Sequence, residues 1–292
     1  MSGRVRVAAH AKINLYLHVI GKRADGYHLL DSLAVFADLH DEVAVEAADE
    51  LSLTIDGPFA SALASETDNL VLRAARGLAE ATRREPKVRI RLTKRIPVAA
   101  GIGGGSADAA AALRALAALW SVEIDPSVAL KLGADVTVCL ASETRFMSGI
   151  GETLEPAPDL PPLHLLLVNP GIAVATKDVF RARSGPFSQP ARFSEAPQDA
   201  AQLARLLLPR RNDLTAAAEL NAPAIRIVRE AIGGTEGCLL ARMSGSGATV
   251  FGLYAAAEEA GRAHETIARN QPGWWCWNGG VRKGDSVAMP AK

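Results

Sequence analysis

The most informative stretch of the chain is Pro97-Val98-Ala99-Ala100-Gly101-Ile102-Gly103-Gly104-Gly105-Ser106-Ala107-Asp108. Four glycines within five positions let the backbone adopt unusual dihedral angles and approach a ligand closely. The alanine-rich run that follows, residues 109–120, predicts a helix that is apolar on almost every side. A glycine loop that leads into a helix N-terminus presents free backbone N–H groups. The stretch therefore predicts an anion site, and phosphate is the usual anion at such sites.

The start of this helix is expected to use Ser106 as its N-cap and Asp108 in its first turn. The loop lacks the Gly-Lys-Ser/Thr ending of a Walker loop. Serine stands where the Rossmann fingerprint needs its last glycine, which argues against a dinucleotide-dependent oxidoreductase. The alternative to a phosphate site is a glycine-rich turn that packs a buried helix against a sheet.

The length of the chain, 292 residues, favours two domains. A proline-rich segment with Pro156, Pro158, Pro161 and Pro162 is the best candidate for a linker. We therefore predict an N-terminal domain over residues 1–160, which carries the glycine loop, and a C-terminal domain over residues 161–292.

Composition limits the class of protein and its partners. Hydrophobic residues make up 49% and charged residues 22%, as in ordinary globular proteins. The formal net charge is zero, which gives no broad electrostatic footprint for nucleic acid. The three scattered cysteines indicate a reducing compartment, and no apolar run is long enough to span a bilayer. A cytoplasmic location without membrane partners is the expectation, and the sequence gives no oligomeric state.

The first twenty residues alternate between apolar and polar side chains, which predicts one strand or two strands with a bend at Ala8-Ala9. This alternation places His10, Lys12 and Asn14 on a common polar face. For a lysine on a strand, the alternative to a functional role is a solvated sheet face.

Further elements follow from local patterns. A helix is expected to open near Asp68 or Asn69, either of which can act as its cap. A helix that begins beside Thr176 is expected to be capped by that residue. The remaining strand predictions cover residues 33–36, 42–46, 51–55, 88–92, 163–168, 239–242 and 248–254, and a further helix is predicted over residues 127–132.

Phosphoryl transfer needs a cradle for the donor phosphates, a cation, and a carboxylate near the acceptor hydroxyl. The glycine loop offers the cradle, Lys12 offers a cation, and a second glycine–serine turn, Ser244–Gly247, is placed to brace the first. Asp135 lies in a Gly-Ala-Asp junction, where it is either a turn or cap residue or the carboxylate that the chemistry needs.

The glycine loop resembles the phosphate loop of the GHMP kinases. The segments Ala11-Lys12-Ile13-Asn14-Leu15 and Asp25-Gly26-Tyr27-His28 resemble, within that superfamily, the kinases that act on a cytidine diphosphate-linked methylerythritol. The resemblance runs from about Val5 to the last predicted strand. It implies an α+β fold, with an N-terminal domain like ribosomal protein S5 and a C-terminal ferredoxin-like domain around one cleft.

The resemblance also implies an activity: transfer of the γ-phosphoryl group of ATP, with Mg²⁺, to the tertiary hydroxyl of a small-molecule substrate in the non-mevalonate route to isoprenoids. Lys12 and Asp135 match the catalytic pair of the family. Positions on the nucleotide side are matched by Pro97, Val98, Ala99, Ala100, Gly101, Ile102, Gly103, Gly104, Gly105, Ser106, Ala107, Asn69 and Lys94. Positions of the cytidine pocket are matched by Asn14, Tyr27, His28, Thr176 and Phe180.

Two residues depart from the family pattern. Ala107 stands where many members have a second serine, and Thr137 replaces a common proline. No protein ligand for magnesium is evident, so phosphates and water are expected to hold it. Another GHMP member, such as homoserine kinase, is the nearest alternative but leaves the Asp25–His28 block without a purpose. An RNA-binding module with an S5-like fold is the alternative from another class, and the zero net charge argues against it.

Overall fold

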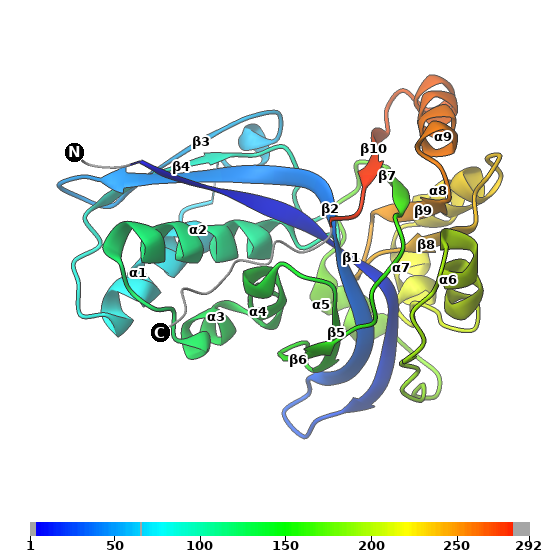
Figure 1. Cartoon of the computed structure of the whole chain (residues 1–292), viewed down its shortest axis with the longest axis horizontal. Helices are drawn as coiled ribbons and strands as arrows, with labels where there is room; N and C mark the ends of the chain where they lie inside the picture. Colours follow the sequence, from blue (N-terminus) through cyan, green and yellow to red (C-terminus); the bar gives the residue numbers. More distant parts are fainter. Residues whose placement is uncertain (1–3, 65, 283–292) are drawn as a thin grey trace.

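Two long antiparallel strands, β1 (Val5–Lys22) and β2 (His28–Ala47), connect the two halves of the molecule (Figure 1). They belong to a computed structural model that describes residues 4–64 and 66–282. The alternating segment is one strand without the break suggested at Ala8-Ala9. The separate strands predicted over residues 33–36 and 42–46 are likewise parts of one strand, because β1 pairs with β2 along almost its whole length.

The first sheet has the order β3-β4-β2-β5-β6 within the described residues, and β1 pairs with β2 outside this path. Its remaining strands are β3 (Ser52–Asp56), β4 (Val88–Thr93), β5 (Arg145–Gly149) and β6 (Thr153–Pro156). Strand β4 alternates between buried apolar side chains and exposed arginines, as expected for a sheet with one solvated face.

Helices cover the other face of this sheet (Figure 1). They are α1 (Leu70–Ala81), α2 (Gly104–Trp120), α3 (Pro126–Leu132) and α4 (Ala134–Ala141), and a 3-10 turn η1 spans Ala60–Leu63. Helix α2 is central, because it packs against both long strands and against α1 and α4. Its many alanines let it lie close to the sheet, while Leu113 and Leu116 are fully buried. Each such leucine contributes about 1.5–3 kcal/mol of hydrophobic stabilisation.

The second sheet is antiparallel with the order β10-β7-β9-β8. Its strands are β7 (His164–Asn169), β8 (Leu240–Met243), β9 (Val250–Tyr254) and β10 (Trp275–Gly280). The helices of this half are α5 (Thr176–Ala182), α6 (Ala200–Leu207), α7 (Thr215–Asn221), α8 (Ala224–Gly233) and α9 (Ala257–Asn270). Trp275 and Trp277 lie on the edge strand β10.

The two halves share a hydrophobic core. Ile13 and Leu15 of β1 are buried with Leu165 and Leu167 of β7 and with Phe251 of β9. The chain passes from the first sheet to the second through the proline-rich segment between β6 and β7. The fold is thus α+β with two halves, as expected, while the division at residue 160 stays a prediction.

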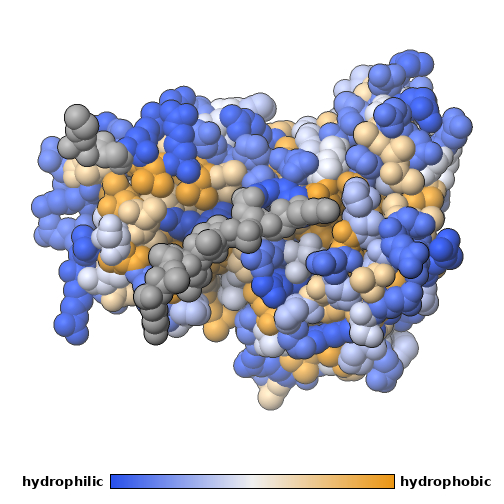
Figure 2. All heavy atoms as spheres, in the orientation of Figure 1, coloured by the Kyte–Doolittle hydropathy of each residue, from blue (hydrophilic) through white to orange (hydrophobic). Residues whose placement is uncertain are grey.

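The view of the surface in Figure 2 shows how polar and apolar side chains are distributed. Figure 2 shows a largely hydrophilic face on which apolar side chains gather mainly over the region of α2 and its neighbouring strands. In the described part of the chain, no helix combines the length and apolar character needed to cross a bilayer.

Three local predictions were wrong or displaced, and one helix was not predicted. Helix α2 begins at Gly104 with Gly103 as its N-cap, so Ser106 is its third residue and not the cap. Asp108 lies beyond the first turn and is buried, because its carboxylate pairs with a buried lysine. Ala175, and not Thr176, caps α5. Residues 134–141 form helix α4 although their apolar residues alternate.

Candidate functional site

A cleft of about 1190 Å³ lies where both halves meet. The β1–β2 pair, the glycine loop, the start of α4, helix α5 and the Ser244–Gly247 turn all contribute to its walls. The structure brings together in this cleft eighteen of the residues singled out from the sequence: Lys12, Asn14, Tyr27, His28, Asn69, Lys94, Pro97, Val98, Ala99, Ala100, Gly101, Gly103, Gly104, Gly105, Ser106, Asp135, Thr176 and Phe180. Ile102 and Ala107 point away from it and are buried in the two cores.

The glycine loop is held by backbone contacts from the second half of the chain. Gly101 has a φ of +74°, and a Cβ there would lie 2.4 Å from the carbonyl oxygen of Gly247. Ser244 Oγ donates a hydrogen bond of 3.1 Å to the carbonyl of Gly101. The amide of Thr249 donates to the carbonyl of Ala100 at 3.1 Å. The second glycine–serine turn therefore braces the first, as the sequence suggested.

The loop ends at the N-terminus of α2, a seventeen-residue helix. The first N–H groups of a helix have no partner within the helix. Gly104, Gly105 and Ser106 occupy these first positions and line the cleft. Gly105 has open space around its α-carbon, since no heavy atom would lie within 4 Å of an added Cβ. This end of the cleft can accept an anion through backbone N–H groups and the helix dipole.

A lysine–aspartate pair lies in the same cleft. Lys12 Nζ donates to Asp135 Oδ1 at 2.8 Å, although 123 residues separate them in the sequence. The Lys12 side chain is 4% exposed, whereas the Asp135 side chain is 45% exposed and remains accessible from the cleft. Lys12 follows a register shift of β1 between His10 and Lys12.

Lys94 lines the cleft but is also the centre of a buried cluster. Its Nζ lies 2.5 Å from Asp41 Oδ2 and 2.7 Å from Asp108 Oδ2. Burial opposes the charge of Lys94, but the two carboxylates outweigh it and raise its pKa. Burial raises the pKa of Asp108 to about 8, with Lys94 acting against the shift and Asp41 adding to it. Asp41 also accepts the backbone N–H groups of Arg95 and Ile96.

Asn69 has a structural role that the sequence indicated. Its side chain accepts from the amide of Val71 at 2.9 Å and caps α1, so the prediction of a cap at this position is confirmed. Its Nδ2 group donates to Glu66 at 2.8 Å.

Aromatic side chains form another wall of the cleft. His28 and Phe180 stack with ring centroids 5.1 Å apart and an interplanar angle of 26°. Burial, followed by the charges of Lys22 and Arg183, lowers the pKa of His28 and favours its neutral form. Tyr27 is 60% exposed beside them. These rings offer the apolar faces that a planar base needs for stacking.

Thr176 and Asn14 complete this region. Thr176 Oγ1 lies 2.9 Å from Ser246 Oγ, which links α5 to the bracing turn. Asn14 is 2% exposed, and its backbone N–H donates to Ser244 Oγ at 3.1 Å. The Thr137 hydroxyl, at one of the positions that depart from the family pattern, is buried without a hydrogen-bond partner in the described chain.

Several residues of the site escaped the sequence reasoning. Asp41 and Ser32 lie in the middle of β2, and neither stands in a glycine, proline or motif context that marks a site. Asp108 was assigned to the wrong part of its helix. The only local signal for Asp41 is that a charged residue alternates with Leu39 and Val43, which are apolar and buried.

Comparison with known proteins identifies the family. The GHMP kinases N terminal domain matches residues 69–146, and the GHMP kinases C terminal domain matches residues 193–271. A 4-diphosphocytidyl-2-C-methyl-D-erythritol kinase of Paramagnetospirillum magneticum is 54% identical over 92% of this chain and 95% of its own length. The enzyme of the same name from Rhodospirillum rubrum is 49% identical over 97% of this chain and 94% of its own length.

Solved structures agree with this family assignment. A crystal structure of 4-(cytidine 5'-diphospho)-2C-methyl-D-erythritol kinase superposes with a TM-score of 0.76 and 36% identity, over 96% of this chain and all of that one. A homoserine kinase from Cytophaga hutchinsonii superposes with a TM-score of 0.75 but only 18% identity, over 97% of this chain and 96% of that one, which shows a shared fold alone. The chain therefore belongs to the GHMP kinases and, within them, to the family of 4-diphosphocytidyl-2-C-methyl-D-erythritol kinases.

Proposed function

We propose that this enzyme transfers the γ-phosphoryl group of ATP to the tertiary hydroxyl of 4-diphosphocytidyl-2-C-methyl-D-erythritol. The observation that carries the proposal is that one cleft contains a phosphate-binding helix N-terminus, the Lys12–Asp135 pair and the stacked His28–Phe180 rings. The helix N-terminus suits the phosphates of the donor, the Lys12–Asp135 pair suits the reacting hydroxyl, and the stacked rings suit the pyrimidine.

The Lys12–Asp135 pair supplies the chemistry expected at the acceptor hydroxyl. Lys12 donates to Oδ1 of Asp135, so the other carboxylate oxygen, Oδ2, is not used by this hydrogen bond. Because the Asp135 side chain is also accessible, it can accept the hydroxyl proton or orient the nucleophile. Lys12 is almost fully buried behind it, where a fixed positive charge stabilises developing negative charge on oxygen more strongly than in water.

The glycine loop is proposed to bind the ATP phosphates through the N-terminal amides of α2. The Ser106 hydroxyl lines this end of the cleft and makes no hydrogen bond within the described chain. Magnesium prefers oxygen ligands and usually keeps several waters while it binds phosphates. Ser106 and Asp135 offer such oxygens, so they fit a magnesium ion held mainly by ATP, which would neutralise phosphate charge.

His28 is proposed to contact the cytosine of the acceptor. Burial lowers the pKa of His28 and favours the neutral ring, in which one nitrogen can accept a hydrogen bond. Stacking of a base on an aromatic side chain is worth about 1–3 kcal/mol by alanine substitution. We therefore expect His28→Ala to lower kcat/KM for the cytidyl acceptor roughly ten- to a hundredfold while the KM for ATP changes little.

The experiment that tests the function is incubation of the purified enzyme with ATP, magnesium and a panel of acceptors, with ADP release and product mass as readouts. The panel contains 4-diphosphocytidyl-2-C-methyl-D-erythritol, the methylerythritol phosphate without the cytidyl group, and homoserine. We expect phosphorylation of the first acceptor alone. Equal turnover of homoserine, or unchanged steady-state constants in His28→Ala, would contradict the assignment of the acceptor pocket.

A further inference from the structure

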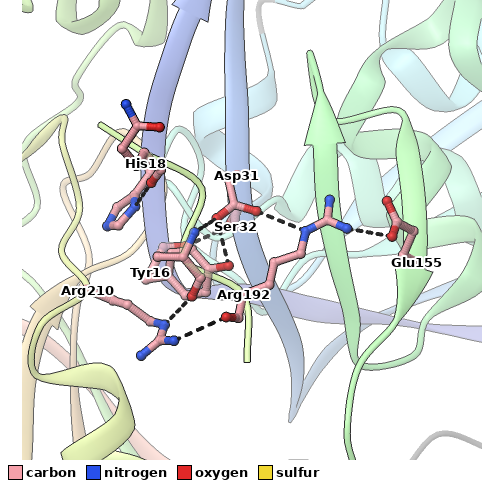
Figure 3. Close-up of polar contacts among 9 residues, drawn as sticks. Tyr16, His18, Asp31, Ser32, Glu155, Arg192 and Arg210 are labelled. Atoms are coloured by element: carbon pink, nitrogen blue, oxygen red, sulfur yellow. Dashed lines mark hydrogen bonds and ion pairs between the residues drawn. The ribbon is translucent and has the colours of Figure 1, made fainter. Parts of the chain in front are cut away.

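A buried carboxylate, Asp31, holds a long loop against the β1–β2 pair (Figure 3). Asp31 is 1% exposed, and its Oδ2 accepts the hydroxyl of Tyr16 at 3.0 Å and the amide of Ala191 at 2.8 Å. Its Oδ1 accepts from Arg192 Nε at 3.1 Å. Arg192 continues to Glu155 of β6 through an ion pair of 2.5 Å.

The same loop is fastened at neighbouring points. We call residues 188–193 the clasp segment. His18 of β1 contacts the carbonyl of Gln189 through Nδ1 at 3.0 Å, and Arg210 donates to the carbonyl of Ala191 (Figure 3). The clasp segment thus has partners on β1, β2 and β6, and a further partner, Arg210, lies shortly after the end of α6. All of these contacts join atoms of the chain itself and form without a bound ligand.

One side of this arrangement reaches Asn14 in the cleft. Ser32, the residue after Asp31, donates from Oγ to the carbonyl of Tyr16 at 2.5 Å and accepts from Asn14 Nδ2 at 2.8 Å. Tyr16 is therefore held by Asp31 at its hydroxyl and by Ser32 at its backbone. Asn14 Oδ1 is buried and has no partner in the described chain. Since a buried polar atom without a partner is costly, the orientation of Asn14 depends on the contacts that fix its amide nitrogen.

The other side of the arrangement reaches α5. The chain runs directly from α5 through Arg183 into the loop that carries the clasp segment. Phe180 of α5 stacks on His28, the first residue of β2. Asp31 is three residues further along the same strand. The clasp segment therefore ties the chain that follows α5 back to the strand that carries the opposing wall.

We propose that Asp31 is a positioning residue for the acceptor: by holding the clasp segment, it fixes the α5 wall of the pocket against the β1–β2 wall and keeps Asn14 oriented. This inference rests on the proposed function. The clasp segment has no hydrogen bond to residues 97–106 in the described chain, so its loss should affect the acceptor and spare ATP.

Asp31→Asn tests the inference, because asparagine keeps only one accepting oxygen, which can serve either Tyr16 and Ala191 or Arg192 but not both, and the charge opposite Arg192 is lost. We expect the acceptor KM to rise about tenfold, with the KM for ATP unchanged. Tyr16→Phe removes one contact of the same carboxylate and should raise the acceptor KM about threefold. It also serves as the second variant if Asp31→Asn does not fold.

The matched control is Tyr254→Phe. Tyr254, the last residue of β9, is a fully buried tyrosine whose hydroxyl makes a hydrogen bond of 2.7 Å with Thr235, and neither residue lines the cleft. Its loss should lower the melting temperature about as much as Tyr16→Phe does and leave both KM values unchanged. If Tyr16→Phe and Tyr254→Phe have the same steady-state constants, or if Asp31→Asn melts earlier with both KM values unchanged, the carboxylate is only structural and the inference is overturned.

Calorimetric titration with cytidine 5'-diphosphate separates this inference from the proposed function. Weaker binding by Asp31→Asn, but not by Tyr254→Phe, supports the positioning role even if the wild-type enzyme fails to phosphorylate the acceptor, an outcome that would overturn only the proposed reaction. Equal binding by all variants, with an active wild-type enzyme, would retain the reaction and overturn the positioning role.

Discussion

Lys12 and Lys94 line the same cleft, and each donates to aspartate, yet their surroundings differ. Lys12 pairs with one carboxylate that is 45% exposed. Lys94 lies between two carboxylates that are 0% and 4% exposed. A half-exposed carboxylate can exchange partners with an incoming hydroxyl, whereas an enclosed one cannot. The comparison therefore distinguishes an accessible pair, for which we propose the chemical role, from an enclosed cluster, although both look alike as lysine–aspartate contacts.

The glycine loop keeps these two lysines apart. A Cβ on Gly103 would lie 3.2 Å from the Cβ of Lys12, and a Cβ on Gly104 would lie 3.1 Å from Lys94 Nζ. Adjacent glycines thus lie against different lysines. The side of Gly104 on which a side chain would extend faces Lys94 and Ile96, so a valine there is expected to disturb the buried cluster as well as any phosphate.

The largest expected effect is a loss of kcat on substitution in the Lys12–Asp135 pair. Asp135→Asn should retain the fold and lower kcat by about 10²–10⁴-fold, because it removes a proton acceptor at the reacting hydroxyl. Lys12→Ala should act similarly, and the double variant should lose much less than the product of the single losses. Single-turnover kinetics with ATP and the acceptor measure this. A kcat of Asp135→Asn within a few-fold of the wild type would contradict the role of the pair.

The next effect concerns the enclosed cluster. Lys94→Met leaves Asp41 and Asp108 buried without their cation, and breaking such a pair typically costs about 3–5 kcal/mol. We expect a large loss in the free energy of unfolding, measured by urea denaturation. Lys12→Met is the matched control, since its partner Asp135 can be solvated, and it should cost much less. Equal losses would show that exposure does not distinguish the two lysines.

A smaller effect is expected from the glycine that touches Lys94. Gly104 has ordinary helical geometry, so Gly104→Ala introduces no backbone strain, but its Cβ would press on Ile96 and Lys94 Nζ at 3.1 Å. Gly105→Ala is the control, because its Cβ meets open space. We expect Gly104→Ala to lower the melting temperature by a few degrees and Gly105→Ala to raise it slightly or leave it unchanged. The reverse order would contradict the placement of Lys94.

A last expected effect is a pH dependence. The pKa of Asp108 is raised to about 8 from 3.8, so the folded protein retains a proton that the unfolded chain has released. Its contribution to stability is present at low pH and is lost as pH rises from about 4 to 8. Asp108→Asn removes this slope, so the variant should gain stability relative to the wild type across that window. Urea titrations at pH 5 and pH 8 measure the difference, and a parallel response of both proteins would contradict it.

Much of the fold followed from local patterns. The strict alternation of the first twenty residues predicted a strand, and the Asn69 cap predicted the start of α1. The register shifts in β1 were not predictable, because they depend on β2 and on the helices packed behind it. Helix α4 escaped the reasoning because its alternating apolar residues resemble a strand, while its burial against α2 decides the outcome.

The site was predictable to a similar extent and for similar reasons. The glycine loop and the resemblance to a known family named residues that do lie in one cleft. The pairing of Lys94 with Asp41 could not be predicted from the sequence, because Asp41 lies 53 residues away and no local motif marks it. Asp31 was missed because its importance comes from a loop about 160 residues downstream.

The brace between Ser244 and Gly101 has a consequence for how this enzyme can be divided. The phosphate loop belongs to the first half of the chain by sequence, but its backbone is held by the second half. A gene that encoded only the first half would specify every residue of that loop and still leave the loop without its support. An exchange of one half between relatives is therefore expected to preserve the conformation of the loop only if it retains the contacts among Gly101, Ser244 and Gly247.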